Sequence, residues 1–248
     1  MKFSENWLRE WVNPDLTTQE LGHQLTMAGL EVDAIELVAP EHTGVVVGQI
    51  ISAQAHPNAD KLQVCLVDVG DLSEQPLQIV CGASNARLGI KVACAMVNAN
   101  LPGDFKIKKS KLRGELSYGM LCSAKEIGLA DAAQGIMELA EDAPLGQTIN
   151  DYFQLNDVSI ELGITPNRSD CLSIEGVARE VAVITSCTMN TPEMKAVISQ
   201  IESTISIQLD AIELCPHYVG RVIKGVNPNA LTPLWMSEKL RRSGVRSI

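Results

Sequence analysis

Residues 45–70 read VVVGQIISAQAHPNADKLQVCLVDVG, and this stretch decides the fold. Two runs rich in valine and isoleucine, a composition typical of β-strands, flank the segment HPNADKL at residues 56–62. Within that segment Pro57 stiffens a turn, and the side chains of Asn58 and Asp60 can bond their own backbone. The stretch therefore predicts two neighbouring strands with a tight connection.

The strand pattern continues to residue 123. Three more β-rich runs follow, LQIVCG at 77–82, KVACAMVN at 91–98 and YGMLCS at 118–123, and the interruption ASNARLG after the third strand is too short for a long helix. Five short strands interrupted in this way match the partly open Greek-key barrel called the OB-fold, although strand counting leaves other small barrels open. Directly afterwards SAKEIGL, residues 123–129, predicts a brief helix.

The first forty residues predict two helices and a strand that cannot enclose a core unaided. Ser4 precedes the helical segment NWLREW, Thr17 and Glu20 form a capping-box pair for a second helix, and Gly29 is a natural stop. The strand is EVDAIELV, residues 31–38. So small a piece leaves too much surface exposed, and it needs a partner from elsewhere in the chain.

That partner is predicted after the barrel. The segment VSIELGIT, residues 158–165, alternates strictly between apolar and polar residues, which indicates a half-buried strand. The polar turn TPNRSD follows, and then a helix from Cys171 to about Thr185, capped by Asp170 or Ser169. The turn is explained about equally well by a helix cap with an arginine–aspartate contact and by a role in an interface.

The end of the chain predicts the start of another unit. Strands are expected at residues 201–209, IESTISIQL, and 219–226, VGRVIKGV. A helix should follow, capped by Thr232 with Pro233 in its first turn and ended by Gly244.

These elements predict an α+β chain in which an OB barrel is inserted into a discontinuous mini-domain. The boundaries are 1–38 with 152–190 for the α/β mini-domain, 39–151 for the five-stranded OB domain, 191–200 for a linker, and 201–248 for the truncated beginning of a third domain.

One basic run stands out against an acidic chain. The formal net charge is -10, yet KIKKSKLR at residues 106–113 places five cations in eight positions. Such a run is usually a solvated loop. Its place between the fourth and fifth strands, at the barrel mouth opposite HPNADKL, favours contact with phosphates. Residues 40–150 carry nine basic and twelve acidic side chains, so RNA binding should be modest and salt-sensitive.

Candidate RNA-contacting residues lie in the two mouth loops, in the interruption after the third strand and on the last strand. Gly119 there permits close backbone approach, and the serines offer hydroxyl groups. The candidates are His56, Asn58, Asp60, Lys61, Asn85, Lys106, Lys108, Lys109, Lys111, Arg113, Ser117, Tyr118 and Ser123. The alternative is structural: a well-made hairpin turn, and a final strand with Met120 and Cys122 buried.

Composition excludes several classes of function. Aromatic residues make up only 4% of the chain, which argues against a broad stacking platform for single strands. The four histidines lie at no ligand spacing from one another or from the seven cysteines, so we expect no metal site and interpret the cysteines as reduced, buried thiols. No catalytic set or phosphate loop stands out, and we predict no catalytic residue and no cofactor. Without a membrane span or signal peptide, we expect a cytoplasmic chain.

HPNADKL, the basic run and SYGMLCS, in this order, resemble the tRNA-binding OB domain of free-standing tRNA-binding proteins, methionyl-tRNA synthetase tails and bacterial phenylalanyl-tRNA synthetase beta subunits. Further stretches resemble the last family along the whole chain. They are MKFSENWLREWV, ELGITPNRSDCLSIEGVAREVA, CPHYVGRVIKGV and LTPLWMSEKLRRSGVRSI.

The resemblance implies the N-terminal region of a subunit that takes part in the ATP-dependent, magnesium-requiring attachment of phenylalanine to its tRNA. It implies as partners phenylalanine-specific tRNA and an alpha subunit that carries the synthetic site, in a heterotetramer of two alpha and two beta chains. Residues 201–248 would begin an editing domain, with Ile248 inside a longer protein. Two alternatives remain: a stand-alone tRNA-binding or RNA-chaperone protein, and an OB domain used only for packing between domains.

Overall fold

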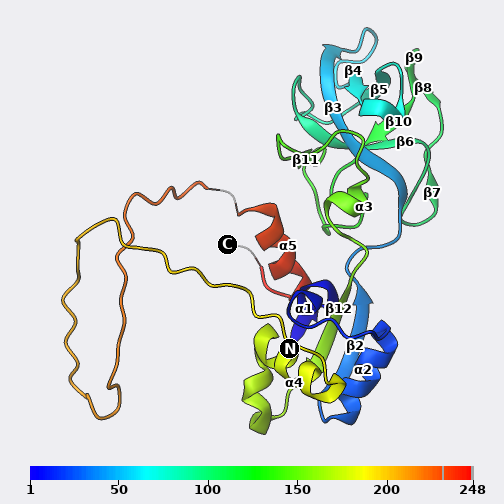
Figure 1. Ribbon diagram of the computed structural model, residues 1–248. Coiled ribbons are helices and arrows are strands. Elements are labelled where there is room, and N and C mark those ends of the chain that lie inside the picture. Colours follow the sequence, from blue (N-terminus) through cyan, green and yellow to red (C-terminus); the bar gives the residue numbers. More distant parts are fainter. Residues whose placement is uncertain (231, 247–248) are drawn as a thin grey trace.

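Two antiparallel sheets organise the computed structural model, which describes residues 1–230 and 232–246 (Figure 1). The smaller sheet has the strand order β1-β12-β2, and the larger has the path β10-β6-β3-β4-β5 with β7 and β11 also paired to β6. A separate ribbon pairs β8 with β9. The strands are β1 Lys2–Ser4, β2 Glu31–Leu37, β3 Thr43–Ala55, β4 Gln63–Asp68, β5 Leu77–Cys81, β6 Lys91–Leu101, β7 Phe105–Lys106, β8 Ser110–Leu112, β9 Glu115–Ser117, β10 Gly119–Leu121, β11 Glu138–Leu139 and β12 Val158–Gly163.

Helices lie mainly beside the smaller sheet. The α-helices are α1 Glu5–Trp11, α2 Thr18–Met27, α3 Ile149–Tyr152, α4 Ile174–Thr185 and α5 Leu234–Arg242, and two 3-10 helices span Gly70–Leu72 and Pro166–Cys171. The start signals predicted for the first two helices are confirmed. The Ser4 side chain accepts a hydrogen bond from the backbone N–H of Trp7, and Thr17 and Glu20 form a complete capping box.

The smaller sheet shares one hydrophobic core with α1, α2 and α4. Phe3 and Leu8 come from the start of the chain, whereas Ile160 and Val177 come from β12 and α4, and all four are 0% exposed. β12 lies between β1 and β2 and pairs antiparallel with both. Segments far apart in the sequence therefore bury each other's apolar faces, and neither could exclude water alone.

The larger sheet is curled. Its long strand β3 pairs with β6 and β4 and shifts register between Ile50 and Ser52, which is where a strand can bend. The sheet returns on itself where Tyr118 N–H donates to the Gln78 carbonyl at 2.8 Å, so that the chain beside β10 approaches β5. All five strands predicted between residues 45 and 123 are present.

Two local predictions around these sheets were wrong. Residues 123–129 form turns rather than a helix, and the Ser123 hydroxyl and backbone N–H both bond to Glu126. The expected helix over 171–185 begins only at Ile174 because Ser173, not Asp170 or Ser169, caps it by accepting from the Gly176 N–H at 3.1 Å.

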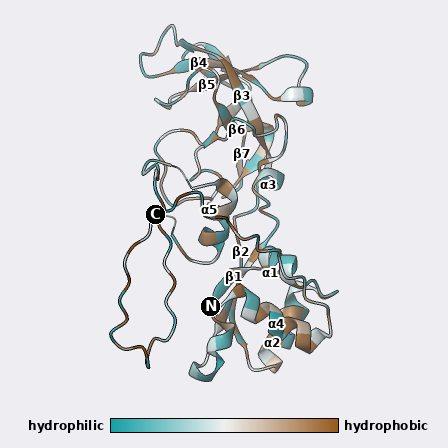
Figure 2. Ribbon diagram, turned by 60° about the vertical axis from the view of Figure 1, so that its left-hand side comes forward, coloured by the Kyte–Doolittle hydropathy of each residue, from teal (hydrophilic) through white to brown (hydrophobic). Residues whose placement is uncertain are grey.

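The strands expected at 201–209 and 219–226 are also absent. Their segments form the two arms of an excursion that leaves the body of the molecule (Figure 1) and meet mainly through side chains, as where Lys224 Nζ donates to Ser203 Oγ at 2.6 Å. Hydrophobic residues occur along both arms with no other described part of the chain beside them (Figure 2). A two-stranded ribbon with no sheet or helix to cover it is marginal in water, which explains the missing ladder.

After the excursion the chain returns to the smaller sheet as α5. Ser159 Oγ, on β12, donates to the Arg242 carbonyl at 2.8 Å, and Lys239 pairs with Glu10 at 2.6 Å. The helix begins after Pro233, which occupies the N-cap position predicted for Thr232, and Gly244 follows it with a positive φ of 71°. The predicted third domain also includes residues 231, 247 and 248, which lie outside the described residues.

Most cysteines are buried, as predicted. Burial raises the pKa of the Cys94 thiol to about 12 and that of the Cys65 thiol to about 11, so these groups stay protonated at neutral pH. Cys187 is half-buried and Cys215, on the excursion, is exposed. The prediction was wrong for Cys215, which lies between the two strands expected on the excursion and is exposed there.

Two helical glycines provide a matched test of the packing around α4. A Cβ at Gly176 would clash with the backbone carbonyl of Asp170, whereas one at Gly22 would lie 3.1 Å from the movable Cδ1 of Ile35. We expect Gly176→Ala to lower the free energy of unfolding by about 1–3 kcal/mol. Gly22→Ala should be nearly neutral, because the gain in helix propensity of about 1 kcal/mol offsets the tight contact. Equal urea midpoints for the two variants would contradict the expected clash.

Candidate nucleic-acid interface

The basic run is a strand and a hairpin rather than the loop expected from the sequence. Lys106 ends β7, which pairs with β6, and Lys111 lies on β8. β8 and β9 meet in a two-residue turn at Arg113 and Gly114, whose φ values are 51° and 107°. Positive φ at both central residues is the geometry that matches the twist of paired strands, and glycine adopts it without strain.

One buried residue anchors this run to the larger sheet. Ile107 is 4% exposed, its N–H donates to the Ala99 carbonyl, and its carbonyl accepts from the Asn98 N–H, both at 2.8 Å. The side chains on either side of Ile107 face solvent. The anchor thus holds the cations against β6 without burying them.

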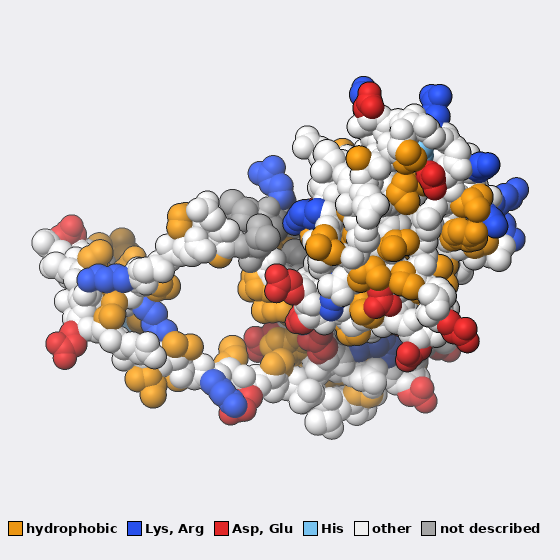
Figure 3. Space-filling model, turned by 90° about the horizontal axis from the view of Figure 1, so that it is seen from above, with side chains coloured by type: hydrophobic (Ala, Val, Ile, Leu, Met, Phe, Trp, Pro, Cys, Tyr) orange, Lys and Arg blue, Asp and Glu red, His pale blue; other side chains and the backbone are white. Residues whose placement is uncertain are grey.

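The five cations are free to meet an anion. Lys106, Lys108, Lys109, Lys111 and Arg113 are all exposed, and none forms an ion pair with any residue that the structure describes. Lysine and arginine side chains gather along the right-hand edge in Figure 3, on the side where Figure 1 places β7, β8 and β9. A cluster of exposed, unpaired cations can bind phosphates without first breaking internal ion pairs.

An aromatic ring lies among these cations. Lys109 Nζ is 4.6 Å from the centre of the Tyr118 ring, within the range of a cation–π contact. Phe105, which precedes the run, is 58% exposed. Among the described residues of the basic run and its immediate surroundings, Tyr118 and Phe105 are the only aromatic ones. Stacking on bases can therefore assist the attraction between cations and phosphates but cannot replace it.

The β3–β4 connection, residues 56–62, is joined to the hairpin. Nε2 of His56 lies 3.0 Å from the Leu112 carbonyl, and the Asn58 side-chain amide donates to the Arg113 carbonyl at 3.4 Å. Asp60 and Lys61 are exposed at the tip of the connection. The structure therefore places both loops of the expected barrel mouth side by side.

Three other candidates are engaged inside the fold. Ser117 is 1% exposed and its hydroxyl accepts from the Val80 N–H at 3.1 Å. Asn85 bonds both the N–H and the carbonyl of Ile136, and Ser123 bonds Glu126. Any use of these groups by RNA would compete with bonds that hold the curled sheet together.

The acceptor role of the Leu112 and Arg113 carbonyls was missed by sequence reasoning. Side-chain type says nothing about where a backbone carbonyl points. The signal available was the dipeptide Arg113–Gly114 inside the basic run, because a glycine at this position favours a two-residue hairpin turn. That turn directs the carbonyls toward the neighbouring connection.

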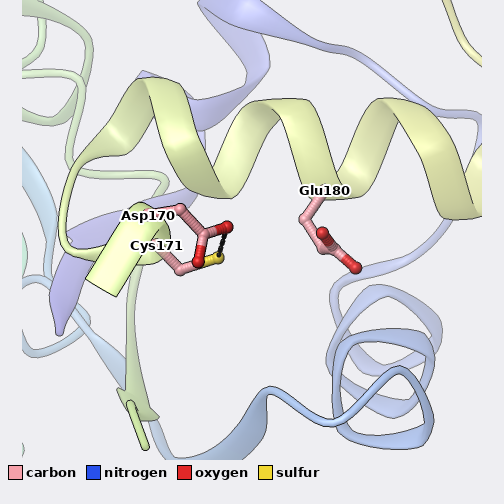
Figure 4. A group of neighbouring side chains, drawn as sticks. All are labelled: Asp170, Cys171 and Glu180. Carbon is pink, nitrogen blue, oxygen red and sulfur yellow. Dashed lines mark hydrogen bonds between the residues drawn. The ribbon is translucent and has the colours of Figure 1, made fainter. Parts of the chain in front are cut away.

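A second cluster of polar groups lies beside α4, the helix that packs against the smaller sheet. The side chains of Asp170, Cys171 and Glu180 approach one another beneath α4 (Figure 4), a grouping that could hold a cation. Arg168 Nη2 already lies 3.2 Å from Asp170, 3.1 Å from Cys171 Sγ and 2.8 Å from Glu180. Its hydrogen bonds hold the pKa of Asp170 below the usual range. The arginine–aspartate contact considered for this turn is thus present, within an ion-pair network.

Comparisons with known proteins match the part of the chain that contains these residues. Residues 45–148 match the family model described as "Putative tRNA binding domain". Over the whole chain, the phenylalanine–tRNA ligase beta subunits of Colwellia psychrerythraea, Idiomarina loihiensis and Vibrio cholerae are 59%, 61% and 57% identical. The chain spans 32%, 31% and 31% of these three relatives, about a third of their length.

Proposed function

The chain belongs to the family of phenylalanine–tRNA ligase beta subunits and corresponds to their amino-terminal third, and on this premise we propose that it supplies tRNA contact and subunit architecture to that enzyme. The reaction of the complete enzyme would be the ATP-dependent attachment of phenylalanine to its tRNA. ATP and Mg²⁺ would serve that reaction at sites outside these 248 residues.

The single observation that carries tRNA contact is the exposed group of five cations that have no ion-pair partner among the described residues. It lies inside residues 45–148, which match the tRNA-binding family model. The curled sheet supports the finer assignment of a five-stranded OB barrel, because the Tyr118–Gln78 hydrogen bond brings the fifth strand back toward the third. In such barrels the mouth loops bind the ligand.

We further assign four segments to the enzyme's architecture. Residues 1–38 and 152–190 form the discontinuous mini-domain around an OB domain at 39–151, and 191–200 form a linker. Residues 201–248 begin an editing domain whose remainder would cover the apolar residues of the excursion. The partners are phenylalanine-specific tRNA and the alpha subunit, two copies of each chain forming a heterotetramer in the cytoplasm. No described helix has the length and apolar character needed to cross a membrane.

Salt dependence tests the proposed contact. We expect tRNA to bind this chain in a titration at about 50 mM salt and to bind at least tenfold more weakly at about 200 mM, because each phosphate contact releases counterions. A polyanion without bases, such as heparin, serves as the comparison for charge alone. If tRNA does not bind at low salt, the result would favour the alternative in which the OB domain only packs between domains.

A further inference from the structure

His56 occupies the point where the two loops of the candidate interface meet. The residue is 5% exposed and directly follows β3, and its backbone N–H donates to the Leu62 carbonyl at 3.0 Å across the connection. The ring could form a hydrogen bond with RNA only through a free nitrogen, and both of its nitrogens are engaged within the fold.

The partners of the two ring nitrogens determine the tautomer. Nδ1 lies 3.0 Å from the backbone N–H of Asn58, which can only donate. Nε2 lies 3.0 Å from the Leu112 carbonyl, which can only accept. Nδ1 must therefore present a lone pair and Nε2 must carry the hydrogen, which is the neutral ring. The imidazole acts as a bridge that accepts from one loop and donates to the other.

The hairpin reached by this bridge has few other supports. β8 and β9 pair with each other and not with the larger sheet. On the β9 side, Gln78 Nε2 donates to the Leu116 carbonyl at 2.8 Å, and the Ser117 hydroxyl accepts from the Val80 N–H at 3.1 Å. The turn itself is held by His56 and by the longer Asn58 contact to Arg113. A two-stranded hairpin is marginal alone, so the bond from His56 helps to fix the turn and, with it, the neighbouring cations Lys111 and Arg113.

We propose that His56 is a positioning residue of the RNA-binding face, whose Nε2–H bond to Leu112 holds the basic hairpin against the β3–β4 connection. This inference rests on the tRNA contact proposed above. Fixing the hairpin before binding means that the cations meet the phosphate backbone together and lose less freedom on association. His56 carries out this role without touching RNA.

Two isosteric variants separate the two halves of the bridge. His56→Asn keeps an acceptor near the position of Nδ1 for the Asn58 N–H but cannot reach Leu112. His56→Gln keeps a donor near the position of Nε2 but loses that acceptor. We expect tRNA affinity to fall about fivefold in His56→Asn, a loss comparable to one hydrogen bond, and to stay within about twofold of the original in His56→Gln.

Two further measurements distinguish a displaced basic hairpin from a general loss of folded structure. The slope of binding against salt concentration should become shallower in His56→Asn, because fewer cations meet phosphates at once. Amide exchange at Leu112 and Glu115, the pair that closes the hairpin, should quicken in the same variant, while the circular dichroism of the chain stays unchanged. Each measurement is made on the whole 248-residue chain.

The outcomes distinguish this inference from the function on which it rests. If the unchanged chain binds tRNA and His56→Asn binds equally well with the same salt slope, His56 does not position the hairpin, and the proposed function stands. Equal losses in the asparagine and glutamine variants would also overturn the bridge to Leu112. If the unchanged chain binds no tRNA at low salt, the proposed function fails, and the inference fails with it.

Discussion

Asp157→Asn is expected to lower the free energy of unfolding by about 3–5 kcal/mol, because it leaves the Arg242 guanidinium buried beside a neutral group. Arg242 Nη1 lies 2.9 Å from Asp157 Oδ2, and the two side chains are 6% and 0% exposed. Glu238 Oε2, 3.1 Å from Arg242 Nη2, remains as a weaker partner. The loss should therefore fall toward the lower end of that range.

Asp157 has further hydrogen-bond partners, so its substitution should affect more than the pair with Arg242. The Ser4 hydroxyl donates to Oδ2 and the Asn6 N–H donates to Oδ1 at 3.0 Å. One carboxylate thus joins the start of α1 and the beginning of β12 to α5, which comes from the far end of the described chain. Loss of its charge should loosen α5 first, because two buried hydrogen bonds then remain between Arg242 and this region among the described residues, one to the Phe153 carbonyl and one from Ser159 Oγ to the Arg242 carbonyl.

Urea unfolding of four variants tests this account. Asp157→Asn and Arg242→Met each remove one member of the pair, and the double variant should recover part of the loss because neither charge of the pair remains. Arg179→Met is the control: its pair with Glu175 has side chains 58% and 44% exposed and should contribute about 0–1 kcal/mol. An Asp157→Asn variant as stable as the control would contradict a buried charge pair at this site.

The second large effect concerns RNA. Changing Lys106, Lys108, Lys109 and Lys111 together to alanine is expected to weaken tRNA binding on the order of 10- to 100-fold at about 50 mM salt. The magnitude of the salt slope should fall by up to about 4, roughly one for each phosphate contact removed. All four side chains are exposed, so the fold should be unaffected.

The control for this variant removes the same charge elsewhere. Lys2, Lys125, Lys195 and Lys224 lie outside the basic run, and their replacement by alanine brings the chain to the same net charge. We expect this control to lose much less affinity, since long-range attraction between exposed charges is largely screened in salt. Equal losses in both variants would show that net charge, rather than the hairpin, governs binding.

Much of the fold could be predicted because its signals are short. Ser4, Thr17 and Glu20 act within one helical turn, and the five strands between residues 45 and 123 follow a local apolar pattern. The prediction failed where a local pattern lacked a partner. Residues 201–209 alternate as a strand should, but no described sheet lies beside them, and the alternation alone cannot make a ladder.

The sequence alone determined which residues could meet phosphate, because charge is a property of the side chain. Only the tertiary structure decided how they are held. The His56 ring meets a carbonyl 56 residues away, and Asp157 meets Arg242 across 85 residues. Backbone carbonyl directions and charge pairs of this kind depend on the path of the whole chain. No local pattern of residue types encodes that path, so the basic run was visible in the sequence and its support was not.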